Sequence, residues 1–263
     1  MSDLFRTRDH VPDFDIYVRQ FAERSAATRA TLRTQLDVAY GPGPDEKLDL
    51  FFPADLKSPA PVHLFVHGGY WRMFAKSDFS FIADTVTSTN SIAAVMDYSL
   101  MPKVRMETIV SQVGLAFDWL VRHAASFGGD GGKVSVSGHS AGAHLCSLLL
   151  TEDRPLQPAG SLLLSGIYEL EPLRHSFLQP EIPITEEEAE RFSPLRLAFR
   201  PKGAVRILVG ERETEPFHAQ ATDLADRAGT TVERIQDGNH MSVALDMGDQ
   251  SSQVGKALIA LVS

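Results

Sequence analysis

Short apolar runs alternate with longer amphipathic stretches along most of the chain. Apolar runs of strand length that are buried on both faces are typical of parallel strands, and the amphipathic stretches between them predict connecting helices. The predicted strands are 48–52, 62–66, 92–96, 134–137, 161–164, 205–209 and 231–236. The predicted helices are 14–34, 77–89, 108–127, 141–150, 216–228 and 250–261.

This alternation predicts an α/β fold with a mostly parallel central sheet and helices on both faces. We expect a single domain over 1–263, with an N-terminal helical segment at about 14–34 and a small cap-like insertion at about 166–199. In open sheets of this kind, ligands bind beyond the carboxyl ends of the strands. The residues that directly follow each apolar run are therefore the first candidates for chemistry.

The composition is that of a globular protein and gives no sign of a nucleic-acid or membrane partner. With 43% hydrophobic and 22% charged residues, the 263-residue chain has the balance of a globular protein with a large core. A net charge of -9 predicts neither a nucleic-acid nor a membrane partner. The one cysteine, Cys146, cannot form an intramolecular disulfide. Because no signal-peptide or membrane-span pattern is visible, the default expectation is a cytoplasmic location.

A G-x-S-x-G motif, Gly-His-Ser-Ala-Gly at 138–142, lies between a predicted strand and a predicted helix. This context is that of a nucleophile elbow. A serine on so sharp a turn has strained backbone dihedrals, so the residues two before and two after it must be small. Ser140 is therefore the predicted nucleophile.

Two histidines flank the motif, and neither is the predicted base. A residue next to the nucleophile, or one turn along the same helix, points away from its hydroxyl. His139 and His144 are therefore expected to be structural. His139 is kept as a candidate substrate contact because it adjoins the nucleophile.

The segment His-Gly-Gly-Tyr-Trp at 67–71 follows the predicted strand 62–66 and matches a loop that donates backbone N–H groups to an oxyanion. We predict an oxyanion hole from the N–H groups of Gly69, Tyr70 and Ala141, without ranking them. The alternative is an ordinary Gly-Gly turn beside packed aromatic residues. Five residues flank the predicted oxyanion hole and the start of the insertion: Tyr70, Trp71, Arg72, Phe74 and Tyr168. Their side chains either line an aromatic-accepting substrate pocket or pack beneath the insertion as core. Trp71 and Tyr168 are the predicted substrate contacts.

His240 is the predicted general base because it follows the last predicted strand, from where an imidazole can reach the elbow. The remaining histidines lie in unsuitable segments: His10, His63, His123, His175 and His218. The acid is expected after strand 205–209, where three glutamates occur close together. Glu213 is predicted, with Glu211 and Glu215 as alternatives and Asp223 as a more distant candidate. No metal-ligand pattern is visible, and neither a metal nor a cofactor is predicted.

Three segments together resemble the serine-dependent kynurenine formamidases of the α/β-hydrolase superfamily. They are HGGYW at 67–71, SGHSAGAHL at 137–145 and GNHMS at 238–242, with support from SGIYEL at 165–170 and EPFHAQ at 215–220. The resemblance implies hydrolysis of an N-formyl aromatic amine through a formyl-enzyme on Ser140. The family acid is usually an aspartate four residues before a phenylalanine, and here Glu213 stands four before Phe217.

We expect a cofactor-free serine hydrolase that cleaves a small acyl substrate, with formamidase activity as the first hypothesis. A carboxylesterase or thioesterase without formamidase activity is the second. A non-catalytic binding protein on a hydrolase scaffold and a metal-dependent hydrolase are the remaining alternatives. The sequence predicts no oligomeric state.

Overall fold

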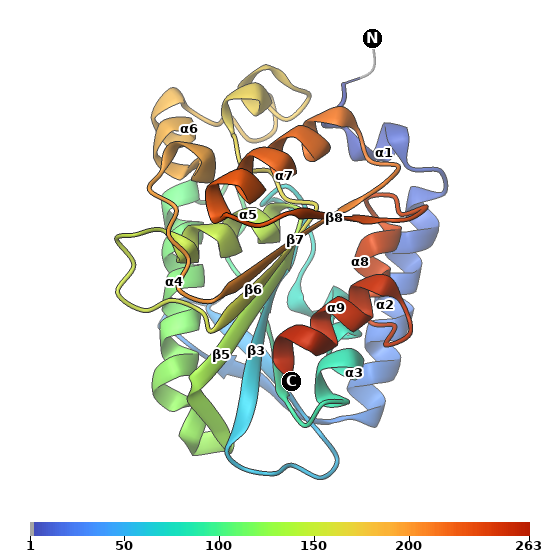
Figure 1. Ribbon diagram of the computed structural model, residues 1–263, viewed down its shortest axis with the longest axis vertical. Helices are drawn as coiled ribbons and strands as arrows, with labels where there is room; N and C mark the ends of the chain where they lie inside the picture. Colours follow the sequence, from blue (N-terminus) through green and yellow to red (C-terminus); the bar gives the residue numbers. More distant parts are fainter. Residues whose placement is uncertain (1–2) are drawn as a thin grey trace.

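An eight-stranded sheet forms the centre of the computed structural model, which describes residues 3–263 (Figure 1). The strand order is β1-β2-β4-β3-β5-β6-β7-β8, in which β1 and β2 are antiparallel to their neighbours and all later pairs are parallel. The strands are β1 (Arg33–Ala39), β2 (Lys47–Phe52), β3 (Ala60–Val66), β4 (Ile92–Met96), β5 (Gly129–His139), β6 (Gly160–Leu164), β7 (Ala204–Gly210) and β8 (Val232–Ile235). The predicted fold class is therefore confirmed.

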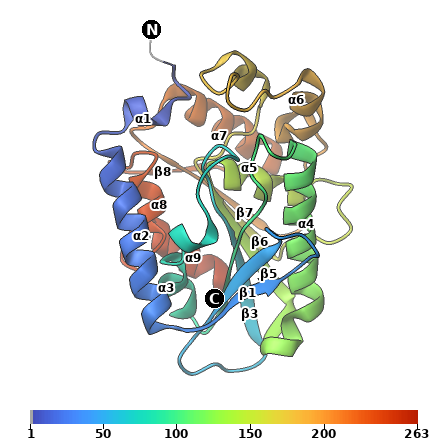
Figure 2. The ribbon, with the colours of Figure 1, turned by 180° about the vertical axis from the view of Figure 1, so that it is seen from behind.

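Helices cover both faces of the sheet, as Figures 1 and 2 show from opposite sides. Side chains of β3 alternate between the two layers, with Leu64 in one buried cluster and Phe65 in the other. One layer contains α4 (Met106–His123), α5 (Ala141–Ser147) and α7 (Glu215–Ala228). The other contains α2 (Phe14–Thr31), α3 (Ile82–Thr87), α8 (Ser242–Asp246) and α9 (Gln253–Val262). No helix within residues 3–263 combines the length and the apolar character needed to cross a bilayer.

Three elements were not predicted: α1 (Thr7–His10), β1 and α8. β1 lies at the edge of the sheet and is mostly exposed, so it has no apolar run to mark it. The predicted helix 77–89 is interrupted, because a short 3-10 turn (Lys76–Asp78) precedes α3. The last helix begins later than predicted, since Ser252 is its N-cap and accepts from Gly255 N at 2.8 Å.

The insertion at 166–199 contains two short 3-10 helices, η4 (Glu171–His175) and η5 (Pro194–Arg196), and one α-helix, α6 (Glu186–Phe192). Glu188 is mostly buried and ties α6 to α4, because it accepts from Arg105 Nε at 2.9 Å and from Met106 N at 3.2 Å. Its neighbours Glu186 and Glu187 are exposed, as expected for a solvated acidic run. This mostly buried carboxylate therefore attaches α6 of the insertion to the start of α4.

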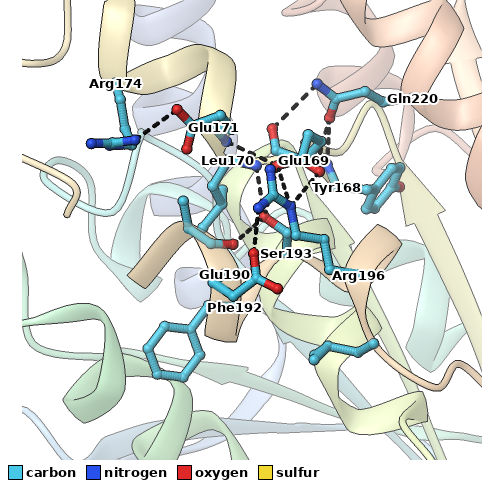
Figure 3. Close-up of polar contacts among 12 residues, drawn as sticks. Tyr168, Glu169, Leu170, Glu171, Arg174, Glu190, Phe192, Ser193, Arg196 and Gln220 are labelled. Atoms are coloured by element: carbon cyan, nitrogen blue, oxygen red, sulfur yellow. Dashed lines mark hydrogen bonds and ion pairs between the residues drawn. The ribbon is translucent and has the colours of Figure 1, made fainter. Parts of the chain in front are cut away.

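A second network holds the two ends of this insertion together (Figure 3). Arg196 lies between two carboxylates, with Nε 2.9 Å from Glu169 Oε2 and Nη1 2.5 Å from Glu190 Oε2. Gln220 of α7 accepts from Tyr168 N at 2.6 Å and from Glu169 N at 2.9 Å. The start of the insertion is consequently fixed to both its own end and α7.

His63 lies inside the sheet between two hydroxyls. Its Nδ1 is 2.8 Å from Ser135 Oγ and its Nε2 is 2.7 Å from Ser137 Oγ. Complete burial lowers the pKa of His63 from 6.5 to about 3, because the charged ring would lose its hydration. The ring is therefore neutral in the folded protein at ordinary pH.

We predict that acidification destabilises the protein in part through His63. Below pH 6.5 the unfolded chain binds a proton at this ring, while the folded chain does not until about pH 3. Stability is therefore present above 6.5 and is lost as the pH falls from there towards 3, by about 1.4 kcal/mol per pH unit for this residue. Urea unfolding of wild type and His63→Gln at about pH 7.5 and 5.5 should show a smaller pH effect in the variant. An identical pH effect in both proteins would contradict the assignment.

Candidate active site

Ser140 occupies the sharp turn between β5 and α5. Its backbone has φ 56° and ψ -120°, which is a strained conformation for a residue with a side chain. A Cβ atom on Gly138 would clash with the backbone of Gly142, and one on Gly142 would clash with the carbonyl oxygen of Val66. Ser140 N donates to Leu164 O at 2.9 Å. The geometry is that of a nucleophile elbow, and both glycines are required by close backbone approach.

His240 and Glu213 form a buried pair at the ends of neighbouring strands. His240 Nδ1 is 2.6 Å from Glu213 Oε2, and their side chains are 6% and 0% exposed. Glu213 Oε1 accepts from Gly210 N at 2.8 Å and from the Ser165 hydroxyl. With a carboxylate as acceptor, His240 Nδ1 is the donor of this hydrogen bond.

The structure separates the three candidate glutamates. Glu211 is exposed and accepts from Asp237 N at 3.0 Å, and Glu215 lies exposed at the first position of α7. Only Glu213 meets the imidazole of His240, which supports its assignment as the acid.

Ser140 and His240 line one small cavity of about 20 Å³ and are both nearly buried. No hydrogen bond joins the hydroxyl to the imidazole among residues 3–263. Contacts of this kind are often long in unliganded enzymes and tighten when substrate binds. The structure therefore brings the predicted nucleophile and the predicted base to the same cavity, with no hydrogen bond between them among residues 3–263.

His139 lines the same cavity and hydrogen-bonds to the backbone of His240. Its Nε2 donates to the carbonyl oxygen of His240 at 2.8 Å, and the two ring centroids are 4.7 Å apart. Burial, with a smaller contribution from the neighbouring His240, holds the pKa of His139 well below its usual value, so its ring is neutral. His139 thus has a structural contact, as expected, and also faces the space predicted for substrate.

The loop after β3 contains unpaired amide groups and packs against the elbow. Gly69, Tyr70 and Trp71 have φ values of 104°, 50° and 58°, and the carbonyl of Gly69 accepts from Arg72 N and Met73 N. Within residues 3–263, no hydrogen bond uses the N–H of Gly69, Tyr70 or Ala141. A Cβ on Gly68 would lie 3.1 Å from Ser140 Cβ, so this loop packs directly against the nucleophile. The arrangement suits an oxyanion hole.

Trp71 and Tyr168, the predicted substrate contacts, do not line the cavity at Ser140. Both side chains are completely buried. The Trp71 indole donates to His144 Nδ1 at 3.2 Å, and His144 Nε2 donates to Phe192 O at 2.7 Å. Because the left-handed backbone at Trp71 directs its ring into the core, this pair connects the loop to α6. Both aromatic side chains are therefore part of the core, which is the alternative that the sequence left open, and do not contact the cavity at Ser140.

The N-terminal segment is part of the site, which the sequence did not reveal. Thr7, Phe14 and Phe21 line the cavity at Ser140. The Tyr70 hydroxyl donates to the carbonyl of Phe5 and lies 3.1 Å from Thr7 Oγ1. Neither a motif nor an apolar run marks these residues, because their contacts are with segments distant in sequence.

The architecture matches that of known hydrolases. A crystal structure of a candidate thioesterase from Silicibacter sp. superposes with a TM-score of 0.87 and 27% identity, covering 98% of this chain and 97% of that one. The chain therefore has the α/β-hydrolase fold and is a hydrolase of that type.

The chain is similar over most of its length to kynurenine formamidases. It is 28% identical to that of Danio rerio over 249 residues, which are 89% of this chain and 84% of the relative. The corresponding protein of Salmo salar is 27% identical over 262 residues, or 94% of this chain and 88% of the relative. A family model described as BD-FAE matches residues 48–157, which include the oxyanion loop and the elbow. The resemblance that the motifs indicated is confirmed.

We predict that Glu213→Gln lowers kcat by about 10⁴-fold, because an amide in place of the carboxylate allows the wrong tautomer of His240. Hydrolysis of a chromogenic ester at saturating substrate measures the effect. Glu211→Gln is the matched control and should retain activity within about twofold, since that side chain is exposed. Equal losses in the two variants would reject Glu213 as the acid.

Proposed function

We propose that the protein is a serine hydrolase that cleaves a small acyl group, most specifically a formyl group, from an aromatic amine. The observation that carries this proposal is the buried Glu213–His240 pair, whose imidazole lines the same cavity as the strained Ser140. The unpaired amides beside it support the same chemistry.

In the proposed reaction, Ser140 Oγ attacks the formyl carbon while His240 Nε2 takes the hydroxyl proton. The carbonyl oxygen becomes an oxyanion, which the N–H groups of Gly69, Tyr70 and Ala141 stabilise. His240 then returns the proton to the departing nitrogen as the C–N bond breaks. A water molecule, deprotonated by His240, then attacks the formyl ester. The bond between the formyl carbon and Ser140 Oγ breaks, His240 returns the proton to Oγ, and formate is released. Glu213 stabilises the imidazolium in both halves of the reaction.

The size of the cavity favours a small acyl group. About 20 Å³ holds one or two water-sized groups, since a single water needs roughly 10–15 Å³. Aromatic side chains close the space on several sides, with Phe14, Phe21 and Phe79 among them. A formyl or acetyl group fits this volume, whereas a long acyl chain requires several of these rings to move. The similarity to kynurenine formamidases supports the same choice.

The similarity to a candidate thioesterase gives the second function, a carboxylesterase or thioesterase without formamidase activity. Steady-state kinetics on N-formylkynurenine, p-nitrophenyl acetate and acetyl-CoA separate the two. Under the proposal kcat/KM is highest for the formamide, and it falls as the acyl chain is lengthened in a series of p-nitrophenyl esters.

Ser140→Ala is expected to lower kcat for every cleaved acyl substrate by at least about 10⁴-fold, because Ser140 Oγ is the proposed attacking oxygen. The other two hydroxyls on the cavity wall, those of Thr7 and Tyr70, are hydrogen-bonded to each other. A fluorophosphonate probe should label wild type and leave this variant unlabelled. As a control for folding, Ser251→Ala changes an exposed serine near the start of α9 and should leave rates unchanged. Near-normal turnover by Ser140→Ala would end the proposal, and no labelling or turnover by wild type would favour a binding protein.

A further inference from the structure

A second cavity adjoins the one at Ser140. It has a volume of about 140 Å³, and four residues line both spaces: Thr7, Phe14, Tyr70 and Met73. The two cavities therefore share a wall. In a substrate whose acyl group lies beside Ser140, the leaving group can occupy the second cavity.

Three guanidinium groups and only one carboxylate line this second cavity: Arg6, Arg8, Arg72 and Glu181. Arg72 Nη1 is 2.5 Å from Glu181 Oε2, and the two side chains are 31% and 45% exposed. Arg72 Nε is buried and has no hydrogen-bond partner among residues 3–263. An unpaired buried N–H is costly, so this guanidinium lacks one of its hydrogen-bond acceptors in the unliganded protein.

The other two guanidiniums come from the N-terminal segment and have carboxylate partners outside the cavity wall. Arg6 Nε is 3.7 Å from Asp9, and its guanidinium lies 5.6 Å from the ring centre of Phe177. Arg8 Nη1 is 2.9 Å from Asp15, and its guanidinium lies 4.5 Å from the ring centre of Phe14. These exposed pairs are weak and screened, so both cations still contribute to the potential of the cavity.

Arg72 belongs to the loop that holds the predicted oxyanion donors, because its backbone N–H donates to Gly69 O at 3.0 Å. An anion held by its side chain is thereby placed in a fixed relation to the elbow. Guanidinium groups bind carboxylates by paired hydrogen bonds, and the neighbouring rings of Phe14, Tyr70 and Phe177 offer apolar and aromatic surface.

Building on the proposed function, we propose that this second cavity is the leaving-group subsite and that Arg72 there binds a carboxylate carried by an aromatic leaving group. Glu181 is the counter-ion that the substrate carboxylate displaces. Arg6 and Arg8 add positive charge from the segment that covers the site. Arg72 is thus a residue that determines specificity and takes no part in bond breaking.

The competing explanation is that Arg72 and Glu181 form a latch between the oxyanion loop and the insertion at 166–199. The two roles predict opposite results for Glu181. If Glu181 only competes with the substrate for Arg72, its removal strengthens binding of an anion. If the pair is a latch, removal of either partner disturbs the loop in the same way, whatever the charge of the substrate.

The test compares 4-formamidobenzoate with formanilide, which differ only in the carboxylate. We expect Arg72→Gln to lower the ratio of kcat/KM for the charged substrate to that for the neutral one by about tenfold, mainly through KM. Glu181→Gln should raise the same ratio severalfold, and Arg6→Gln should lower it about twofold. Arg191→Gln, on an exposed arginine that pairs with Glu107, is the matched control and should leave it unchanged.

A ratio that is unchanged in both Arg72→Gln and Glu181→Gln, or shifted in the same direction in both, would overturn the subsite. If wild type cleaves neither formamide, the proposed function fails while the subsite stays testable by calorimetric binding of benzoate and benzamide. Wild type should then bind benzoate more tightly than benzamide, and Arg72→Gln should remove that preference. Equal benzoate affinity in wild type and Arg72→Gln would reject the anion subsite.

Discussion

The strained backbone at Ser140 is the constraint around which the rest of the site is arranged. A left-handed φ on a residue with a side chain is unfavourable by itself and persists only where the surroundings leave no alternative. Here the surroundings are β5 below, α5 behind and the carbonyl of Val66 in contact range of Gly142. The parallel sheet supplies all three, because β3 and β5 are neighbours and end at the same edge. The sheet thus holds the Ser140 hydroxyl at the carboxyl end of β5.

The same edge collects the other groups. β3 ends at the oxyanion loop, β7 ends shortly before Glu213, and the turn after β8 carries His240. Each strand end carries one predicted catalytic group, and Glu213, the proposed acid, accepts from the amide of Gly210 and the hydroxyl of Ser165. A buried carboxylate needs such partners, since an uncompensated charge at that depth would be expensive. The hydrogen bonds from Gly210 and Ser165 hold the Glu213 carboxylate in place, and the carboxylate in turn orients the His240 ring.

The segments that cover the candidate site lie outside the central sheet. The N-terminal segment and the insertion at 166–199 contribute aromatic and basic side chains around a cavity that leaves little room beside Ser140. Size selection for the acyl group and charge selection for the leaving group are thus assigned to segments outside the sheet. Loops and terminal segments carry specificity in many folds because they vary without disturbing the core.

By itself, the sequence determined the fold class and predicted the chemistry. Apolar runs report burial on both faces, and the motif around Ser140 requires glycines for reasons of local sterics, so both are legible along the chain. Among Glu211, Glu213 and Glu215, by contrast, only tertiary structure decided which carboxylate meets His240. It also turned Trp71 and Tyr168 into the core and brought Thr7 and Arg72 to neighbouring cavities. Local patterns record backbone constraints and burial, whereas the direction of a side chain depends on partners far away in sequence.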